Sequence, residues 1–234
     1  MRRVHVTKLE QGDIILDAVQ AHHVRDVLRL ESGDQVEAFD GAGSTAAATL
    51  AVCDPQRVVL RVGRIEHNQP SVELTIASAL PKGERADWMI EKLSELGVTR
   101  FTPLRTARSV VHPEGKNKFD RWTRIATESA KQSHRPGVMI IDSLTKLESL
   151  LASASSAVYL SPQSDDSLLD HAQRATRHLI LIIGPEGGWT NEELALFESK
   201  NVLPARMTRT VLRIETAAIT AAAIAQSSFA RRAS

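Results

Sequence analysis

Apolar and polar positions in the first part of the chain form short runs separated by turn-forming residues. Residues 35–39 (QVEAF), 45–52 (TAAATLAV) and 57–65 (RVVLRVGRI) are predicted as strands, because each run is short, rich in β-forming side chains and bounded by turns. A polar stretch with a proline, residues 67–71 (HNQPS), then predicts a boundary between two domains, residues 1–70 and 71–234. The first domain is expected to be a small β-barrel or sheet.

From residue 72 onward, predicted strands alternate with predicted helices. Apolar side chains recur at helical spacing in residues 84–98, as at Met89, Ile90 and Leu93, and the pattern repeats in residues 117–133. An Ala-rich helix is predicted near the C-terminus, over residues 216–232. The predicted strands are residues 72–80, 156–162, 178–184 and 201–207. Such alternation is typical of an α/β domain with a mainly parallel sheet.

Composition sets limits on the kind of protein. The chain has 234 residues, 42% hydrophobic and 24% charged, with a formal net charge of +1, as in an ordinary globular protein. The lone Cys53 excludes an intramolecular disulfide and a Cys-based zinc cluster, and its apolar neighbours favour a buried, inert thiol. We find no apolar run of about 18 residues and no signal peptide. We therefore expect a cytoplasmic protein, with no membrane partner and no metal.

The basic residues are unevenly distributed. Residues 100–135 hold nine Lys or Arg against three acidic residues, which predicts a phosphate-binding face. A solvated helix face with no partner explains the charge alone equally well.

A glycine-rich loop, residues 184–188 (GPEGG), follows the apolar run 178–183 (HLILII). Thr190 and Glu193 have the spacing of a capping box, so the loop is expected to join the carboxyl end of a buried strand to a helix. Ligands bind at such ends in open α/β sheets, and glycines let a ligand approach the backbone. Glu186 is then a candidate functional carboxylate. A tight turn without a ligand is the alternative.

The segment 211–217 (VLRIETA) comes just before the Ala-rich helix. We predict that Val211 and Leu212 are buried and that Thr216 is the N-cap of the helix. The N-terminus of a helix favours an anion nearby, which makes Arg213 and Glu215 candidates for a site. A capped terminal helix without a ligand is the alternative explanation.

Residues 41–46 (GAGSTA) match the outline of a dinucleotide-binding fingerprint, which would indicate an oxidoreductase. Only about ten residues separate this motif from the next turn, however, and a crossover helix needs a dozen or more. A hairpin turn is the better interpretation.

Together, “GPEGG” and “VLRIETAA” resemble the RsmE family, SPOUT-class enzymes that methylate N3 of a uridine in small-subunit ribosomal RNA. Residues 21–41 resemble the family's PUA-like RNA-binding domain, and residues 82–98, 103–110 and 121–135 match its helix and basic segments. The chain departs from the family's usual residues at Thr208, Thr210 and Ile214.

The resemblance implies a PUA-like β-barrel domain followed by an α/β domain with a parallel sheet and a deep trefoil knot. It also implies a homodimer that binds S-adenosyl-L-methionine among three loops of the knot and acts on a decoding-region uridine of 16S rRNA. The cofactor-binding residues would be Leu160, Ser161, Pro162, Ile183, Gly184, Pro185, Glu186, Gly187, Gly188, Val211, Leu212, Arg213, Glu215, Thr216 and Ala217.

Two sets of residues are assigned candidate roles in that reaction. Arg213 is expected to stabilise negative charge on the uracil, and Glu186 or Glu215 to accept the N3 proton, with a slight preference for Glu186. Either carboxylate has a structural alternative. The RNA-binding candidates are Arg2, Arg3, Arg25, Arg29, Lys82, Arg105, Arg108, Arg121, Lys131 and Arg135. A non-catalytic RNA-binding module is the competing function, and the presence of the loop glycines and of Arg213 disfavours it.

Overall fold

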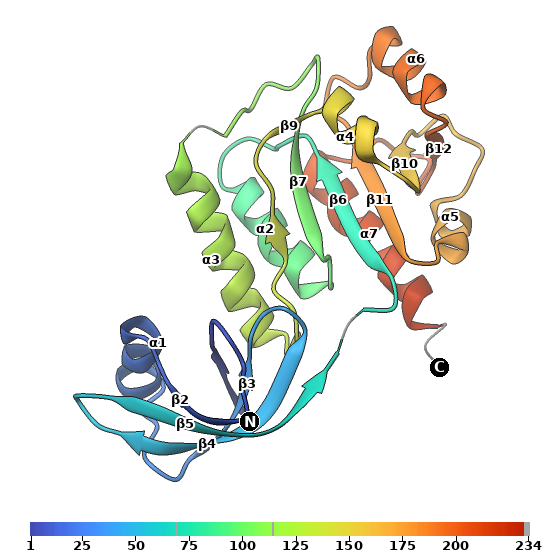
Figure 1. The fold of residues 1–234 in the computed structure, drawn as a ribbon. Helices are drawn as coiled ribbons and strands as arrows, with labels where there is room; N and C mark the ends of the chain where they lie inside the picture. The colour runs from blue at the N-terminus through green and yellow to red at the C-terminus, as the bar shows by residue number, and fades with distance from the viewer. Residues whose placement is uncertain (69, 114, 232–234) are drawn as a thin grey trace. The chain divides into compact units, whose positions relative to one another are not determined.

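The computed structural model describes residues 1–68, 70–113 and 115–231, which form two compact units (Figure 1). The first unit comprises Met1–Gln69 and Ala130–Val138, and the second comprises Pro70–Ser129 and Met139–Ser234. A segment from the middle of the chain thus belongs with the N-terminal residues.

The first unit is built on a five-stranded sheet with the order β1-β3-β4-β5-β2. Its strands are β1 (Arg2–His5), β2 (Gly12–Ile15), β3 (Gln35–Phe39), β4 (Ser44–Cys53) and β5 (Val58–His67). The three strands predicted from the sequence are confirmed as β3, β4 and β5. The short helices α1 (Ala18–His22) and η1 (His23–Val27) connect β2 to β3. Val4, Val24, Val36, Leu50 and Leu60 are among the residues of its apolar core.

A hairpin occupies the motif that resembled a dinucleotide fingerprint. Strands β3 and β4 pair antiparallel, and between them the Asp40 carboxylate accepts hydrogen bonds from the amides of Ala42 and Ser44. Gly41 and Gly43 supply the positive φ angles of the turn, 74° and 105°. The hairpin interpretation is confirmed, and the dinucleotide-binding alternative is wrong.

The segment 130–138 joins the first unit through backbone contacts. The amide of Val138 donates to the carbonyl oxygen of Gly41 at 2.8 Å, and Gly137 forms a bridge with Gly41. A Cβ on Gly41 would lie 2.9 Å from the Val138 side chain. Only glycine therefore lets the two stretches approach so closely.

The second unit contains a parallel sheet with the order β12-β10-β11-β6-β7-β8, as the sequence predicts (Figure 1). Its strands are β6 (Glu73–Ser78), β7 (Arg100–Arg105), β8 (Ile140–Ile141), β10 (Ala157–Leu160), β11 (His178–Ile183) and β12 (Leu203–Ala205). The short β9 (Thr145–Lys146) pairs with β7. Four of these strands, β6, β10, β11 and β12, lie within the longer runs predicted from the sequence, and β12 is only three residues long.

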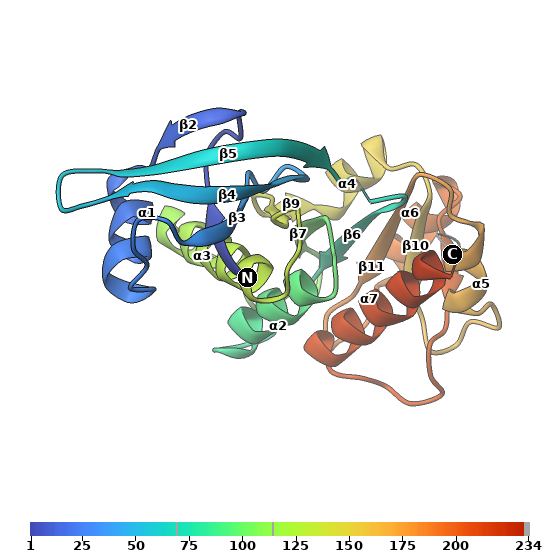
Figure 2. The same ribbon diagram turned by 90° about the horizontal axis from the view of Figure 1, so that it is seen from below.

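Helices flank this sheet (Figure 2). They are α2 (Arg85–Glu95), α3 (Lys116–Gln132), α4 (Leu147–Ser153), α5 (Leu168–Arg174), α6 (Asn191–Ser199) and α7 (Ile214–Ala230). Helix α7 packs on β6 and β11 and beside α2 and α5. Helices α4 and α6 contribute Leu147, Leu151 and Phe197 to a cluster with sheet residues that include Leu104 and Ile182.

The helical patterns predicted from the sequence are largely confirmed. Met89, Ile90 and Leu93 of α2 are fully buried, as is Trp122 of α3. Trp88, in contrast, is 49% exposed, although it stands within the same predicted helix, directly before Met89. Cys53 is only partly buried, and this desolvation raises the pKa of its thiol.

Candidate functional site

A cavity of about 650 Å³ lies where the chain leaves β10, β11 and β12. These three strands are neighbours in the parallel sheet, so the loops at their carboxyl ends meet. The cavity is lined by residues 159–163, 183–189, 194, 205, 207, 208, 210–212, 214 and 217. It therefore brings together the glycine loop 184–188 and residues of the segment 211–217, both singled out from their sequence, with residues 160–162, which only the family resemblance implied.

Most of the predicted cofactor-binding residues line this cavity, while three do not. Arg213, Glu215 and Thr216 are absent from its wall. Those that line it are Leu160, Ser161, Pro162, Ile183, Gly184, Pro185, Glu186, Gly187, Gly188, Val211, Leu212 and Ala217.

The capping box predicted at the start of α6 is confirmed, and it fixes the end of the glycine loop. Thr190 Oγ1 accepts a hydrogen bond from the amide of Glu193, and Glu193 Oε2 accepts one from the amide of Thr190. The other carboxylate oxygen of the buried Glu193 accepts from the amide of Ala107, at 2.8 Å. One carboxylate thus ties the loop after β7 to the loop after β11.

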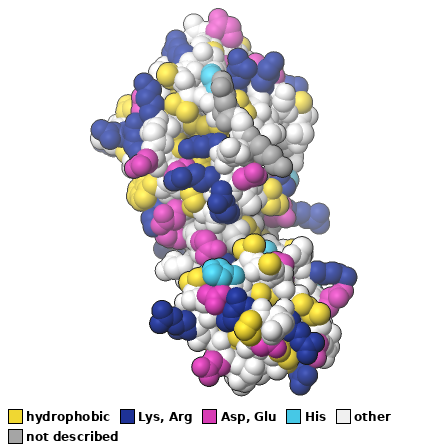
Figure 3. All heavy atoms as spheres, turned by 90° about the vertical axis from the view of Figure 1, so that its left-hand side faces the viewer, with side chains coloured by type: hydrophobic (Ala, Val, Ile, Leu, Met, Phe, Trp, Pro, Cys, Tyr) yellow, Lys and Arg dark blue, Asp and Glu magenta, His cyan; other side chains and the backbone are white. Residues whose placement is uncertain are grey.

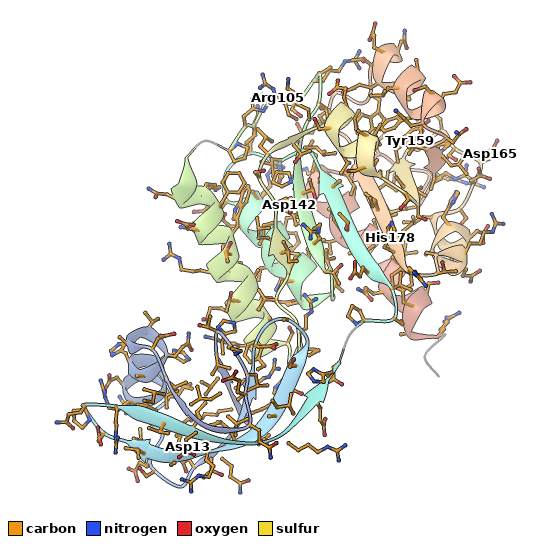
Figure 4. All side chains as sticks on the ribbon, viewed as in Figure 1. Asp13, Arg105, Asp142, Tyr159, Asp165 and His178 are labelled. Carbon is orange, nitrogen blue, oxygen red and sulfur yellow. The ribbon has the colours of Figure 1, made fainter. Side chains whose placement is uncertain are left out.

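Trp189 is a residue of the cavity that the sequence analysis missed. Its Nε1 donates to the carbonyl oxygen of Leu160 at 3.3 Å, which links the first loop to the second. Its ring meets the Phe197 ring edge-on, with 4.9 Å between the ring centroids. Phe197 in turn stacks on Tyr159, with 4.2 Å between the ring centroids. Figure 4 labels Tyr159, at the end of β10. A tryptophan directly after two glycines was the available signal.

Two positions of the loop, Gly184 and Gly188, favour glycine for different structural reasons. A Cβ on Gly184 would lie 2.9 Å from the Trp189 ring, so this position must stay bare. Gly188 has a φ of 69°, and its amide donates to the carbonyl oxygen of Pro185 at 2.9 Å to close a turn.

The last loop corrects two predictions. Val211 is not buried but 81% exposed, Leu212 is only partly buried, and both line the cavity. Helix α7 begins at Ile214 with Arg213 as its N-cap residue, so Thr216 is an exposed residue of the first turn and not the cap. The unusual Thr208 and Thr210 contact each other, because Thr208 Oγ1 donates to the carbonyl oxygen of Thr210 at 2.8 Å.

The three candidate catalytic residues lie in different surroundings. Glu186 is exposed and lines the cavity, and Arg213 is exposed at the start of α7. Glu215 is 5% exposed, and its Oε1 accepts a hydrogen bond from Arg85 Nη1 at 3.1 Å. Its Oε2 has no hydrogen-bond partner among the residues that the structure describes. Glu215 thus faces α2 and not the cavity.

Arg3 corrects the set of RNA-binding candidates. Its side chain is buried: Nε donates to Glu37 at 2.5 Å, Nη1 donates to the carbonyl oxygens of Ala130 and Arg135, and its guanidinium lies over the ring of Phe39. A guanidinium in that position anchors the first unit and is not available to a phosphate.

The other basic candidates remain at or near the surface, some with acidic partners. Arg25 pairs with Asp26, and Arg121 pairs with Asp87. Arg2 donates to the carbonyl oxygen of Leu28. Arg29, Lys82 and Arg105 are exposed, Lys131 is partly buried, and burial lowers the pKa of Arg135 to about 10. Figure 3 shows Lys and Arg side chains interspersed with acidic ones on the drawn face of each unit.

Asp87 is the common acceptor of three side chains of α3. It accepts hydrogen bonds from Trp122 Nε1 at 2.8 Å, from Arg121 Nε at 2.8 Å and from Lys118 Nζ at 3.3 Å. Burial acts to raise the pKa of its carboxyl group, but these donors outweigh that effect and hold the pKa below its usual value.

Two kinds of feature are not found in the described residues. They contain no group of three or more His, Cys, Asp or Glu side chains placed to hold a metal ion. None of the helices in this part of the chain is long and apolar enough to span a membrane.

Comparison with known proteins identifies the family. A family model described as an RNA methyltransferase domain matches residues 67–226, and one described as an RNA methyltransferase PUA domain matches residues 16–63. A relative from Synechocystis sp., named Ribosomal RNA small subunit methyltransferase E, is 31% identical over 214 residues, which are 88% of this chain and 70% of the relative. One of the same name from Bacillus subtilis is 31% identical over 85% of this chain and 83% of its own length. The chain belongs to the RsmE family of RNA methyltransferases.

Solved structures of similar proteins match nearly the whole chain. A methyltransferase from Legionella pneumophila, in complex with the cofactor SAM, is 29% identical with a TM-score of 0.84 and covers 96% of both chains. An RsmE from Neisseria gonorrhoeae, bound to S-adenosyl methionine, is 26% identical with a TM-score of 0.86 and covers 97% of both chains. The PUA domain and the α/β domain with a parallel sheet, both expected from the sequence, are therefore confirmed for this RsmE family member.

Proposed function

We propose that this protein transfers the methyl group of S-adenosylmethionine to N3 of a decoding-region uridine in 16S rRNA. The observation that carries the proposal is the cavity formed by the loops after β10, β11 and β12. It belongs to a chain of the RsmE family that is similar over nearly its full length to proteins crystallised with this cofactor.

The residues of the cavity fit a nucleoside-like cofactor. About 650 Å³ lies within the usual range for a small-molecule pocket. Gly187 and Gly188 expose backbone on one side, and Ile183, Leu212 and Ala217 supply an apolar wall for a purine ring. We assign residues 160–162, 183–188, 211, 212 and 217 to cofactor contacts. Arg213, Glu215 and Thr216 act instead at the start of α7.

The reaction requires a carrier of an activated methyl group, a deprotonated nitrogen and an in-line approach. S-adenosylmethionine supplies a methyl group bonded to a sulfonium. Holding the uracil in line with that methyl group supplies much of the rate. We assign Arg213 to stabilising the negative charge that develops on a uracil carbonyl oxygen when N3 loses its proton. Glu186 accepts that proton, because it is the candidate carboxylate that lines the cavity.

Glu215 has a different role in this proposal. Its bond to Arg85 joins the first turn of α7 to the start of α2, so it holds the loop that carries Arg213. Glu215→Gln keeps an oxygen for Arg85 and is expected to retain more activity than Glu186→Gln does.

RNA binding is assigned to basic residues of both units that lie at or near the surface. In the first unit these are Arg2, Arg25 and Arg29, together with Lys131 and Arg135 of its second segment; in the second unit they are Lys82, Arg105, Arg108 and Arg121. Residues 1–70 then act mainly as the RNA-binding domain and residues 71–234 as the methyltransferase domain. Phosphate contacts make the affinity for RNA fall steeply with salt.

Three further features belong to the same proposal. The α/β domain is threaded as a trefoil knot, the β strands of the first unit close into a barrel, and the enzyme works as a homodimer with an RNA site shared between subunits. Its substrate would place it in the cytoplasm. Light scattering of the purified protein tests the dimer, since a monomer in the presence of RNA and cofactor would exclude a shared site.

The first experiment is titration calorimetry with S-adenosylhomocysteine, with NADH as the control. We expect the first to bind and the second not to bind. Methyl transfer is then measured with small-subunit RNA and radiolabelled cofactor, and reverse transcription locates the product, because a methyl group on N3 blocks base pairing.

Arg213→Ala separates chemistry from binding in that assay. We expect kcat to fall by roughly 100-fold or more, as when one charge-stabilising donor is removed, while S-adenosylhomocysteine affinity is kept. Unchanged turnover would refute the role of Arg213. Lack of labelled product with every small-subunit RNA would refute the proposed function.

A further inference from the structure

Arg108 contacts the glycine loop from the loop after β7. Its Nη1 donates to the carbonyl oxygen of Gly187 at 2.6 Å and lies 3.5 Å from that of Trp189. Its alkyl chain lies along the bare face of the loop, since a Cβ on Gly187 would be 3.2 Å from Arg108 Cδ. Arg108 therefore holds the part of the loop that lines the cavity.

The backbone around Arg108 is fixed while its guanidinium stays exposed. The amide of Ala107 donates to Glu193, and Thr106 and Ser109 are joined by a hydrogen bond of 2.8 Å between their hydroxyls. These bonds anchor the residues on both sides of position 108. The guanidinium is thus presented to solvent by a rigid turn (Figure 4 labels Arg105, at the end of β7 before this turn).

The hydrogen bonds of Arg108 use only one of its three nitrogens. Nε and Nη2 make no hydrogen bond within the part of the chain that the structure describes, and the guanidinium interacts through space with the exposed Glu192 carboxylate, with which an RNA phosphate would compete. These two N–H groups form the edge of the guanidinium that binds a phosphate in a bidentate manner. One side chain can therefore hold the Gly187 carbonyl and an RNA phosphate at the same time.

The geometry points to Arg108 as the residue that couples RNA binding to cofactor binding. A phosphate on the Nε–Nη2 edge fixes the guanidinium, and the fixed guanidinium holds the glycine loop in the shape that lines the cavity. Cofactor and RNA then bind cooperatively, and by linkage each raises the affinity of the other by the same factor. This inference rests on the proposed function, and it makes Arg108 a positioning residue.

The variant Arg108→Lys distinguishes a coupling role of Arg108 from an effect of its positive charge alone. Arg108→Lys keeps one positive charge but cannot bind a carbonyl and a phosphate through separate edges. Arg105→Lys is the matched control, because Arg105 is exposed nearby at the end of β7 and has no side-chain bond to the glycine loop. In Arg105→Lys the affinity for RNA falls but the coupling factor stays.

The test is calorimetric titration of the full chain with S-adenosylhomocysteine, with and without a hairpin RNA carrying the decoding-region uridine. For the unaltered protein we expect the RNA to lower the Kd at least about 5-fold, the low end of typical allosteric coupling. For Arg108→Lys the ratio of the two Kd values should approach 1. A merely structural role of Arg108 would change both Kd values equally and leave their ratio intact.

The outcomes separate this inference from the function it rests on. If S-adenosylhomocysteine binds but RNA leaves its Kd unchanged in the unaltered protein, the coupling is refuted and the proposed function stands. If Arg108→Lys keeps the full ratio, Arg108 is not the coupling residue. If the cofactor product binds neither with nor without RNA, the proposed function fails and the coupling fails with it.

Discussion

Replacing Arg3 with methionine should destabilise the first unit without removing a phosphate contact. Methionine matches the Arg3 side chain only as far as Nε; it carries no donor and lacks the guanidinium that lies over the Phe39 ring. The substitution leaves the Glu37 carboxylate and the carbonyl oxygens of Ala130 and Arg135 without the bonds that Arg3 makes to them. The segment 130–138 would lose a principal anchor to β1.

The expected size follows from the burial of the pair. Removing one partner of a buried ion pair costs about 3–5 kcal/mol. The Arg3 side chain is 2% exposed, but that of Glu37 is 27% exposed, so water can partly solvate the remaining carboxylate. We therefore expect the lower end of that range, about 3 kcal/mol.

The assay is urea denaturation of the full-length protein, followed by far-UV circular dichroism. Arg2→Met is the control, because Arg2 is exposed on the same strand and should cost less than about 0.5 kcal/mol. The double variant Arg3→Met with Glu37→Met should recover part of the loss, since no unpaired carboxylate remains. RNA affinity measured against salt concentration should keep its slope in Arg3→Met. Wild-type stability together with a shallower salt slope would show that Arg3 contacts RNA and that the anchoring role is wrong.

Three further predictions concern the cavity and the first unit. Gly184→Ala places a Cβ 2.9 Å from the anchored Trp189 ring and should weaken S-adenosylhomocysteine binding at least about 10-fold by calorimetry. A Cβ at Gly188 meets no atom within 4 Å, so Gly188→Ala should cost only about 1 kcal/mol of backbone strain and weaken binding less. An equal loss of affinity in the two variants would contradict this. Glu193→Ala removes a helix cap and the partner of the Ala107 amide and should lower the free energy of unfolding by about 2 kcal/mol. The exposed Glu192→Ala, which loses only a carboxylate in the first turn of the same helix, should lower it clearly less. Burial and the nearby Lys131 lower the pKa of His5, so the unfolded chain binds a proton more readily and stability should fall as the pH drops from 7 through the ordinary histidine value of about 6.5. His5→Phe should flatten that part of the pH profile in thermal melts, and an unchanged slope would assign it to other groups.

The elements that sequence reasoning located have a strong local signal. Strands β3, β4 and β5 are rich in β-forming residues between clear turns, and α2 and α3 show apolar faces at helical spacing. The short strands β1 and β8 lack such a signal, because they pair with partners elsewhere in the chain and their few residues set no period.

In the candidate site, too, local sequence predicts some residues and misses those whose partners lie far along the chain. The loops 184–188 and 211–217 were found because their glycines and their charged residues are unusual beside apolar runs. Local sequence could not show that Val211 faces a cavity and not the core, since both places take an apolar side chain. It could not show that Arg3 is buried either, because its partners are Glu37 and residues beyond position 129. Thr216 has the side chain of an N-cap, yet α7 begins at Ile214 without a side-chain cap bond.

The discontinuous first unit has a consequence for how this protein is made and divided. A nascent chain that ends at Gln69 has all five strands of the sheet but not yet Ala130–Val138. Until that stretch leaves the ribosome, the Gly41 carbonyl and the Arg3 guanidinium lack the partners that it supplies. Synthesis must therefore pass through much of the second unit before the N-terminal one can close. A fragment cut at the apparent boundary would remain incomplete, and adding residues 130–138 as a separate peptide should restore part of its stability.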